Sequence, residues 1–402
     1  MKKNLYGYLA VLVFFLASCS SDNISSGPTT VAVDEDEDET TAVIDESYTY
    51  KLPVIFHVLY KDALDESQYI PQERLRQILA NVNDLYAGAF YASQWNSKSE
   101  NIGVRFVLAK YDEKGRKLPQ PGVEYVKWDG SYPINPSDFM GNHKDYVRYI
   151  WEPNEYINVM MYHFAAENGT QSETLGITHM PYTLEGEELA GLTKLAANKA
   201  GISKSNLGFA YCASINSKYA WKDAGGNYYQ SDRYTNADHR MFRRAQSLEY
   251  LSKDVNVTLA HELGHYLGLH HIFAERETDT GYEMTDDCRD SDYCDDTPSY
   301  TRRGYTEGLY RYMESQSSNA PLKVEVLMAR TGCNGETFQS ANFMDYFFTL
   351  GFKFSADQKA RMRHVLYHSP LIPGPKKGRV RATRALNGRV EGIVDLPIKI
   401  VK

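Results

Sequence analysis

The fold of this chain is decided by one stretch, His261-Glu262-Leu263-Gly264-His265-Tyr266-Leu267-Gly268-Leu269-His270-His271, which has the spacing HExxHxxGxxH. Apolar residues recur at helical intervals through this part of the chain, at Val255, Leu259, Leu263 and Leu267. Such spacing predicts an amphipathic helix packed on a core. His261 and His265 are then one turn apart on one face, so both imidazoles can reach a single ion. The stretch therefore predicts a metal centre built on a buried helix.

The third ligand is expected just beyond that helix. A helix continued past position 267 would turn His271 away from the metal, and Gly268 can take the positive φ that swings the chain back. Three protein ligands leave one position open for water, as in catalytic zinc sites, whereas structural zinc is normally enclosed by four side chains rich in Cys. His270 is one residue out of register and is expected to point elsewhere. We predict one zinc ion on His261, His265 and His271.

Glu262 is placed to act as the base of a hydrolytic reaction. Zinc lowers the pKa of a bound water to about 7. Glu262 can take the proton of that water as it attacks a peptide carbonyl, and can then pass the proton to the leaving amine. The pattern thus predicts hydrolysis of peptide bonds by Glu-assisted attack of a zinc-bound water, without a covalent intermediate.

A second motif follows at Asn342-Phe343-Met344-Asp345-Tyr346. Together with the long zinc motif it resembles the metzincin clan of metallopeptidases, and more narrowly the pappalysin family, whose methionine turn commonly reads N, aromatic, M, D or S, Y. The resemblance implies that Met344 forms the floor below the histidines. It also implies that Tyr346 lies near the zinc and hydrogen-bonds the tetrahedral intermediate. Further matching segments extend the similarity over roughly residues 50–368: Leu52–Tyr60, Arg74–Tyr86, Asp296–Pro298 and Phe354–Arg363.

The implied fold is α+β, a metzincin-like catalytic domain of two lobes over residues 48–370. The upper lobe, about 48–271, should contain a twisted mixed sheet and two main helices. The lower lobe, about 272–370, should be loop-rich and contain the methionine turn and a C-terminal helix. Runs rich in Val, Ile, Phe and Tyr predict strands at Pro53–Tyr60, Ile102–Lys110, Tyr156–Phe164 and Phe209–Ser214. The stretch Leu175–Pro181 resembles the family's edge strand, which would hold an extended peptide by main-chain hydrogen bonds.

The lower lobe has an acidic segment, residues 286–298, whose closely spaced carboxylates suit a calcium ion. By the family resemblance, Asp292 and Thr297 would be its ligands. The alternative is a solvated acidic loop without an ion.

The cysteines suit an exported protein, in which a disulfide can pin long loops. By analogy with the family, Cys288 pairs with Cys333. Cys212 and Cys294 are then free or buried.

The N-terminal end predicts export. Lys2 and Lys3 precede an apolar run over residues 5–16, which has the charge and length of a signal peptide rather than a membrane span. Leu16-Ala17-Ser18-Cys19 resembles the bacterial lipobox, which implies a signal peptide of residues 1–18 and a lipid anchor on Cys19. The protein would then sit at the outer membrane or cell surface, or face the periplasm. The alternative is an ordinary signal peptide with an incidental cysteine.

The segments on either side of the catalytic domain are strongly charged. Residues 19–47 are polar, with an acidic run at 34–39, and predict a disordered tether; a short pro-segment whose carboxylate blocks the zinc is the alternative. Residues 371–402 form a basic tail, for which we prefer a solvated, weakly ordered chain. The tail can instead dock on the tether, carry maturation sites, or add a strand at Val394–Ile400.

Three functions are open. The preferred one is a membrane-anchored zinc metalloendopeptidase acting on proteins or peptides. A non-catalytic surface module on a decayed peptidase scaffold is the second, and the intact Glu262 argues against it. The third is a thermolysin-like enzyme whose third ligand is a glutamate, Glu275 or Glu283. The net charge of −8 argues against nucleic acid as a partner, and nothing in the sequence indicates an oligomer.

Overall fold

The computed structural model describes residues 43–89, 98–141, 143–166, 173–234, 248–279, 281–316, 323–346, 348–377 and 390–402. All of these residues belong to one structural unit. The predicted signal peptide, the lipidation site Cys19 and most of the predicted tether lie outside them. The end of the tether is described, and there Asp45 accepts a hydrogen bond at its carbonyl oxygen from Arg363 at 2.5 Å.

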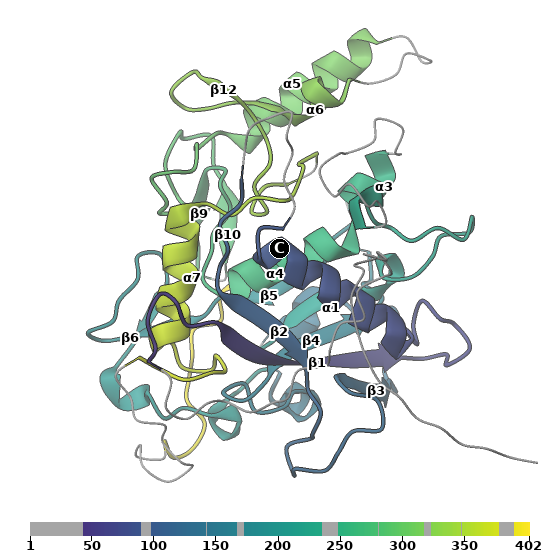
Figure 1. The fold of residues 1–402 in the computed structure, drawn as a ribbon, viewed down its shortest axis with the longest axis vertical. Coiled ribbons are helices and arrows are strands. Elements are labelled where there is room, and N and C mark those ends of the chain that lie inside the picture. Colours follow the sequence, from purple (N-terminus) through teal and green to yellow (C-terminus); the bar gives the residue numbers. More distant parts are fainter. Residues whose placement is uncertain are drawn as a thin grey trace, which may run out of the picture. The chain divides into compact units, whose positions relative to one another are not determined.

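A mixed β-sheet of seven strands lies at the centre of the described residues (Figure 1). Its strands are β1 (Tyr50–Tyr60), β2 (Val104–Leu108), β3 (Val123–Lys127), β4 (Ile157–Tyr162), β5 (Gly176–His179), β8 (Ala213–Asn216) and β13 (Ile400–Val401). The order across the sheet is β13-β5-β8-β4-β1-β2, and β3 also pairs with β1. The strands from β2 to β8 in this order run parallel, whereas β5 is antiparallel to β8 and β13 is antiparallel to β5.

The observed strands follow the apolar runs of the sequence. Three predicted strands, Pro53–Tyr60, Ile102–Lys110 and Tyr156–Phe164, contain or overlap β1, β2 and β4. The predicted strand Phe209–Ser214 begins later, at Ala213, although its first residues are buried. A short apolar run of this kind indicates burial more reliably than it indicates where pairing begins.

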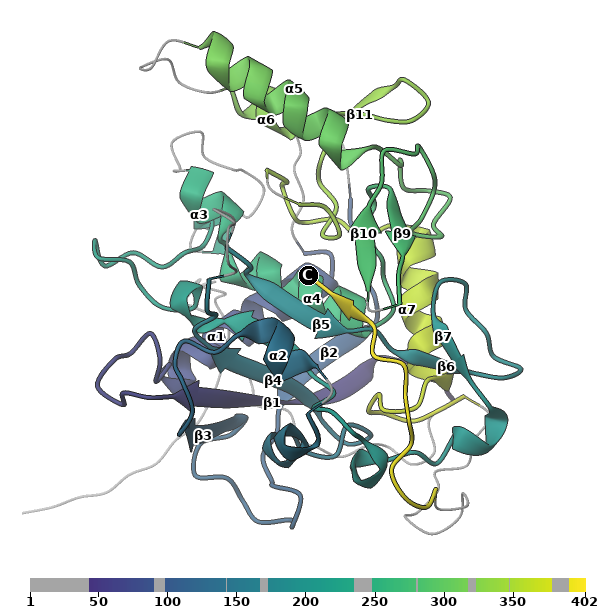
Figure 2. The ribbon, with the colours of Figure 1, turned by 180° about the vertical axis from the view of Figure 1, so that it is seen from behind.

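Two long helices, α1 (Gln72–Tyr86) and α4 (Val255–Tyr266), lie side by side on one face of the sheet (Figure 1). Tyr86 of α1 donates a hydrogen bond from Oη to the carbonyl of Ala260 in α4 at 3.0 Å. The other face carries the short helix α2 (Pro136–Met140), which Figure 2 shows in front of the strands. Helix α4, which contains the zinc motif, is thus packed between α1 and the strands β5 and β8.

The remaining elements lie mostly after α4. They are the helices α3 (Leu248–Ser252), α5 (Arg302–Ser315), α6 (Val324–Met328) and α7 (Ala356–His368), the hairpins β9 (Glu275–Glu277) with β10 (Tyr282–Met284) and β11 (Ala329–Thr331) with β12 (Thr337–Gln339), and the parallel pair β6 (Tyr182–Leu184) and β7 (Thr193–Leu195). One mixed sheet with few helices confirms the predicted α+β class. Among the described helices, none has the length and apolar character needed to span a membrane.

The C-terminal tail differs from the preferred prediction of a solvated chain. The first residues of the segment 390–402 hydrogen-bond to Asn206, and at its end Ile400 and Val401 form β13 on the sheet. Val394 donates its backbone N–H to the carbonyl of Asn206 at 2.9 Å, and Leu396 is buried. The solvated chain is therefore wrong for these residues. The tail does add a short strand, but this strand shares only Ile400 with the predicted range Val394–Ile400, and it covers the edge of β5.

Helix α4 begins at a buried N-cap, Asp254, which is 1% exposed. Its carboxylate accepts hydrogen bonds from the backbone N–H groups of Asn256 at 3.0 Å and Ser231 at 2.9 Å. The guanidinium of Arg233, also buried, lies 3.5 Å from the same carboxylate. A negative charge at this end of a helix also interacts favourably with the helix dipole. Asp254 therefore fixes where the metal-site helix starts.

Replacing this cap should destabilise the fold. We expect Asp254→Ala to lower the free energy of unfolding by about 2–4 kcal/mol, because α4 loses its cap and a buried guanidinium loses its carboxylate. Urea denaturation measures this change. Asp254→Asn keeps an acceptor for the cap and should lose less; an equal loss in the two variants would contradict the capping role.

Candidate active site

Three histidine rings meet at the C-terminal end of α4. His261 and His265 project from α4 one turn apart, and Gly268, with a φ of +91°, turns the chain so that His271 comes back to them. Their Nε2 atoms are 3.0 Å apart for His261 and His265, 3.1 Å for His265 and His271, and 3.2 Å for His261 and His271. Nitrogens around a tetrahedral zinc at 2.0–2.1 Å are separated by roughly 3.3–3.4 Å. The three rings are therefore close to the spacing that such an ion needs.

The second nitrogen of each ring faces an oxygen acceptor. These pairs are His261 Nδ1 with the carbonyl of Phe343 at 2.6 Å, His265 Nδ1 with the carbonyl of Leu269 at 2.8 Å, and His271 Nδ1 with the carboxylate of Glu275 at 3.0 Å. Because the two carbonyls accept hydrogen bonds, Nδ1 of His261 and His265 carries the proton and Nε2 of each is left with a lone pair. The carboxylate of Glu275 lies close to Nδ1 of His271 without hydrogen-bond geometry and favours a proton on that nitrogen as well. Burial lowers the pKa of His261 to about 4 and the pKa values of the other two well below their usual range.

The triad fits the requirements of a metal centre. Its neutral rings point three lone pairs at one place, which is unfavourable unless a cation lies between them. Within the described ranges, His261, His265 and His271 are the one group of His, Cys, Asp or Glu side chains close enough together to hold a metal ion. Three nitrogen ligands without a fourth protein ligand are typical of catalytic zinc.

Glu262 lies beside the triad and is 2% exposed. Thr178 of β5 donates a hydrogen bond from Oγ1 to Oε2 of this carboxylate at 2.6 Å. Burial raises the pKa of Glu262 to about 8, and the bond from Thr178 opposes that rise. A carboxylate held in one orientation within a buried site is suited to proton transfer. Thr178 falls within the predicted edge strand, but nothing in the sequence marked it as a partner of Glu262.

The methionine turn lies directly against α4. Met344 is fully buried, and its Sδ is so close to Gly264 that a Cβ added there would lie 2.7 Å from it. The carbonyl of Met344 accepts a hydrogen bond from the backbone N–H of Ile272 at 3.1 Å. The turn thus contacts both the helix of the first two histidines and the segment after the third.

Tyr346 reaches the same site. The centroid of its ring is 4.4 Å from that of His271 and 5.5 Å from that of His261. Within the described part of the chain, its Oη is buried and has no hydrogen-bond partner. The guanidinium carbon of Arg302 lies 4.3 Å from the ring centroid. Because a buried tyrosine hydroxyl normally finds a partner, this one is available to a ligand.

These groups open into a cleft of about 1570 Å³. Its walls include His261, Glu262, His271 and Tyr346, together with Gly176 and Ile177 of β5. The cleft is large enough for a stretch of extended peptide. The residues of β13 line it as well.

The other sequence candidates for the third ligand lie elsewhere. His270 is buried, and its ring packs against Tyr282 and Tyr293 with centroids 5.0 and 5.3 Å away. Glu275 faces Nδ1 of His271 rather than the converging nitrogens. Glu283 is exposed and pairs with Arg276 at 3.0 Å. The geometry favours His271 as the third ligand, with Glu275 as the acceptor that orients it.

A disulfide joins the acidic segment after the triad to a later part of the chain. Cys288 and Cys333 form the disulfide that the family resemblance implied, while Cys212 and Cys294 are buried free thiols. Thr297 donates a hydrogen bond from Oγ1 to Asp292 at 2.5 Å, and burial raises the pKa of Asp292 to about 8. The two proposed calcium ligands are therefore adjacent, and calcium itself stays a prediction.

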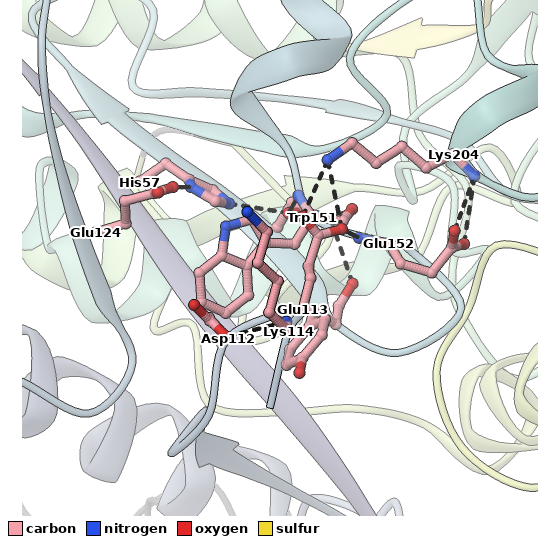
Figure 3. Close-up of polar contacts among 10 residues, drawn as sticks. His57, Asp112, Glu113, Lys114, Glu124, Trp151, Glu152 and Lys204 are labelled. Carbon is pink, nitrogen blue, oxygen red and sulfur yellow. Dashed lines mark hydrogen bonds and ion pairs between the residues drawn. The ribbon is translucent and has the colours of Figure 1, made fainter. Parts of the chain in front are cut away.

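A second polar cluster lies outside the cleft, around His57 of β1 (Figure 3). His57 Nδ1 is 2.8 Å from the carboxylate of Glu124 on β3, and Nε2 is 2.9 Å from Oδ1 of Asn158 on β4. Both ring nitrogens therefore have partners. This histidine ties three strands together, and it does not belong to a metal-binding group.

The residues of this site lie in a part of the chain that matches a known peptidase family. The peptidase M43 family, described as pregnancy-associated plasma protein-A, matches residues 211–367, which include the triad, Glu262 and the methionine turn. This part of the chain is pappalysin-like. The match covers less than half of the chain, and for this region it confirms the predicted pappalysin-like family and the enzyme class, a metalloendopeptidase. The pappalysin-like region ends within α7.

The curated proteins contain no match to this chain. Two similar solved structures are both of mirolysin from Tannerella forsythia. The mature enzyme in complex with a cleaved peptide is 17% identical, with a TM-score of 0.45, over 79% of this chain and 91% of that one. A promirolysin mutant is 16% identical, with a TM-score of 0.46, over 81% of this chain and 83% of that one.

The close contact between Gly264 and Met344 allows the packing of the methionine turn against α4 to be tested. We expect Gly264→Ala to lower the free energy of unfolding by about 1–3 kcal/mol, because its new methyl group would overlap a buried sulfur. The double variant with Met344→Ala should lose less than the sum of the two single variants. Thermal denaturation of the three variants measures this coupling, and strict additivity would contradict the contact.

Proposed function

We propose that this chain is a zinc-dependent metalloendopeptidase in which His261, His265 and His271 hold one zinc ion and Glu262 is the general base. The observation that carries the proposal is the convergence of three neutral imidazoles on one place, beside a buried carboxylate and in a cleft. When bound there, zinc would polarise a peptide carbonyl and make water acidic enough to be deprotonated near neutral pH.

The chain's own residues supply the proton transfer and the positioning. Glu262 accepts the proton of the attacking water and delivers it to the leaving amine nitrogen. Thr178 keeps one carboxylate oxygen fixed during both transfers. Tyr346 donates its unpaired hydroxyl to the carbonyl oxygen as negative charge develops on it, which favours the transition state over the ground state.

The proposed substrate is a peptide in extended conformation. The strand β5 lies along the cleft, and a peptide added beside it would be bound mainly through main-chain hydrogen bonds. Such binding holds the scissile bond in place and depends little on sequence. It therefore suits an endopeptidase, which must accept chain on both sides of the cleaved bond.

The location of the enzyme is a separate proposal that rests on sequence alone. The apolar run over residues 5–16 and the lipobox-like stretch before Cys19 support an exported lipoprotein, attached to a membrane through acyl chains on Cys19. The acidic residues that follow support a tether between the membrane and the enzyme. Calcium at Asp292 and Thr297 also remains a proposal, supported by their adjacency.

Removing the base should abolish hydrolysis and spare the metal site. We expect Glu262→Gln to lower kcat about 10²–10⁴-fold on a denatured protein substrate, with zinc content unchanged, because only proton transfer is lost. A chelator should abolish the activity of the unmodified enzyme, and added zinc should restore it. The control is Glu283→Gln, an exposed glutamate near the cleft mouth. Full activity of Glu262→Gln would refute the mechanism.

Zinc affinity can distinguish whether Glu275 orients His271 or binds the zinc ion directly. If Glu275 orients His271, Glu275→Gln should weaken zinc binding about 10–100-fold, whereas His271→Ala should weaken it further. Titration of the metal-free protein with zinc measures both affinities, and Glu283→Gln is again the control. Near-normal zinc affinity in His271→Ala would show instead that a glutamate completes the site.

A further inference from the structure

The edge of β5 inside the cleft is occupied by the chain's own C-terminal residues. Ile400 and Val401 form β13 antiparallel to β5, with Ile400 opposite His179 and Val401 opposite Thr178. The backbone N–H of Met180 donates to the carbonyl of Lys399 at 2.9 Å. Figure 2 shows β13, in yellow, beside β5 in front of α4.

The opposite side of this segment contacts the hairpin of β9 and β10. Gly281 forms a parallel bridge with Ile400. A Cβ added to Gly281 would lie 2.5 Å from the carbonyl oxygen of Ile400, so the close approach requires glycine. The segment is therefore held between a strand of the sheet and a hairpin from the other side of the cleft, as an extended peptide would be.

Polar contacts position the segment further. The ammonium of Lys399 is 3.2 Å from the carboxylate of Glu277 and donates a hydrogen bond to the carbonyl of Thr278. The hydroxyl of Tyr182 donates to the carbonyl of Pro397 at 2.8 Å. Most of these contacts use main-chain atoms, and Val401 is the one fully buried side chain between Ile398 and Lys402.

The C-terminal segment lies beside the groups proposed to carry out catalysis. Thr178, which pairs with Val401, is the residue whose hydroxyl holds Glu262. Ile398, Ile400, Val401 and Lys402 line the same cleft as His261, Glu262 and Tyr346. A peptide added to β5 at this register would need the place that these residues fill.

We propose that residues Ile398–Lys402 are a tethered, substrate-like inhibitor of the enzyme, which must leave β5 before a peptide can bind. This inference rests on the proposed peptidase function and adds its regulation. A tethered segment needs only weak contacts to occupy its site, because its effective concentration is in the millimolar range. The few buried side chains of the segment, and an ion pair whose carboxylate, that of Glu277, is 51% exposed, agree with such weak, reversible contacts.

Peptide binding tests the proposal without requiring catalysis. The probe is a fluorescent peptide with the sequence of residues 396–402, added to Glu262→Gln protein with and without residues 398–402. We expect the shortened chain to bind the probe at least tenfold more tightly than the full chain. A probe with proline in the position of Val401 should not bind, because the register directs the N–H of this residue at Thr178 of β5 and proline has no N–H.

Activity gives a second readout with Glu262 intact. Removal of residues 398–402 should raise kcat/KM for a peptide substrate at least tenfold, mainly through KM, and the probe should then inhibit competitively. Lys399→Glu in the full chain should shift both measurements in the same direction, because it places a carboxylate beside Glu277. The matched control is Ile393→Asp, which adds a carboxylate at a position of the same tail that is 49% exposed and outside the cleft.

The results of these binding and activity experiments distinguish a failure of the inhibitor proposal from a failure of the proposed peptidase activity. Equal probe binding by the full and shortened chains would overturn the inference. So would a shortened chain that melts at a lower temperature and shows lower kcat/KM, because β13 would then be a structural strand. If the probe binds the shortened chain selectively but no form cleaves peptides, the inference stands and the proposed hydrolysis fails.

Discussion

The repulsion between three imidazole lone pairs is the constraint around which this structure is arranged. The Nε2 atoms of the triad lie 3.0–3.2 Å apart, and each Nδ1 faces an oxygen from a different place in the chain. The acceptors come from the methionine turn, from the residue just beyond α4, and from β9. Without these acceptors the rings could rotate and separate. The surrounding segments therefore hold in place an arrangement that only a cation makes favourable.

This constraint explains which parts of the site could be predicted from sequence. His261, His265, Gly268 and His271 lie within one short stretch, so helix geometry and one glycine turn are enough to bring them together. Met344 and Tyr346 could be predicted only because their motif occurs together with the first one. Strands such as β1 and β4 are revealed by their apolar runs, since burial on a sheet requires that composition.

Other parts depend on contacts between distant segments. Thr178 reaches Glu262 only because β5 lies beside α4, and neither residue carries a local sign of the other. Glu275 was considered as a metal ligand, whereas its place behind His271 depends on the hairpin that begins there. These features require the fold before they can be stated.

The C-terminal tail shows how an edge strand can order a segment that would otherwise be solvated. The basic residues of the tail, at 376–389, favour a solvated chain, whereas residues 390–402 are rich in Val and Ile. An unpaired strand edge, however, offers a row of main-chain donors and acceptors to any extended chain nearby. A peptidase that binds substrate on β5 needs this edge to be accessible, and the same accessibility invites unwanted pairing. A tethered segment that covers the edge protects it from unwanted pairing. Because few of its side chains are buried, a substrate peptide that makes more contacts can still displace it.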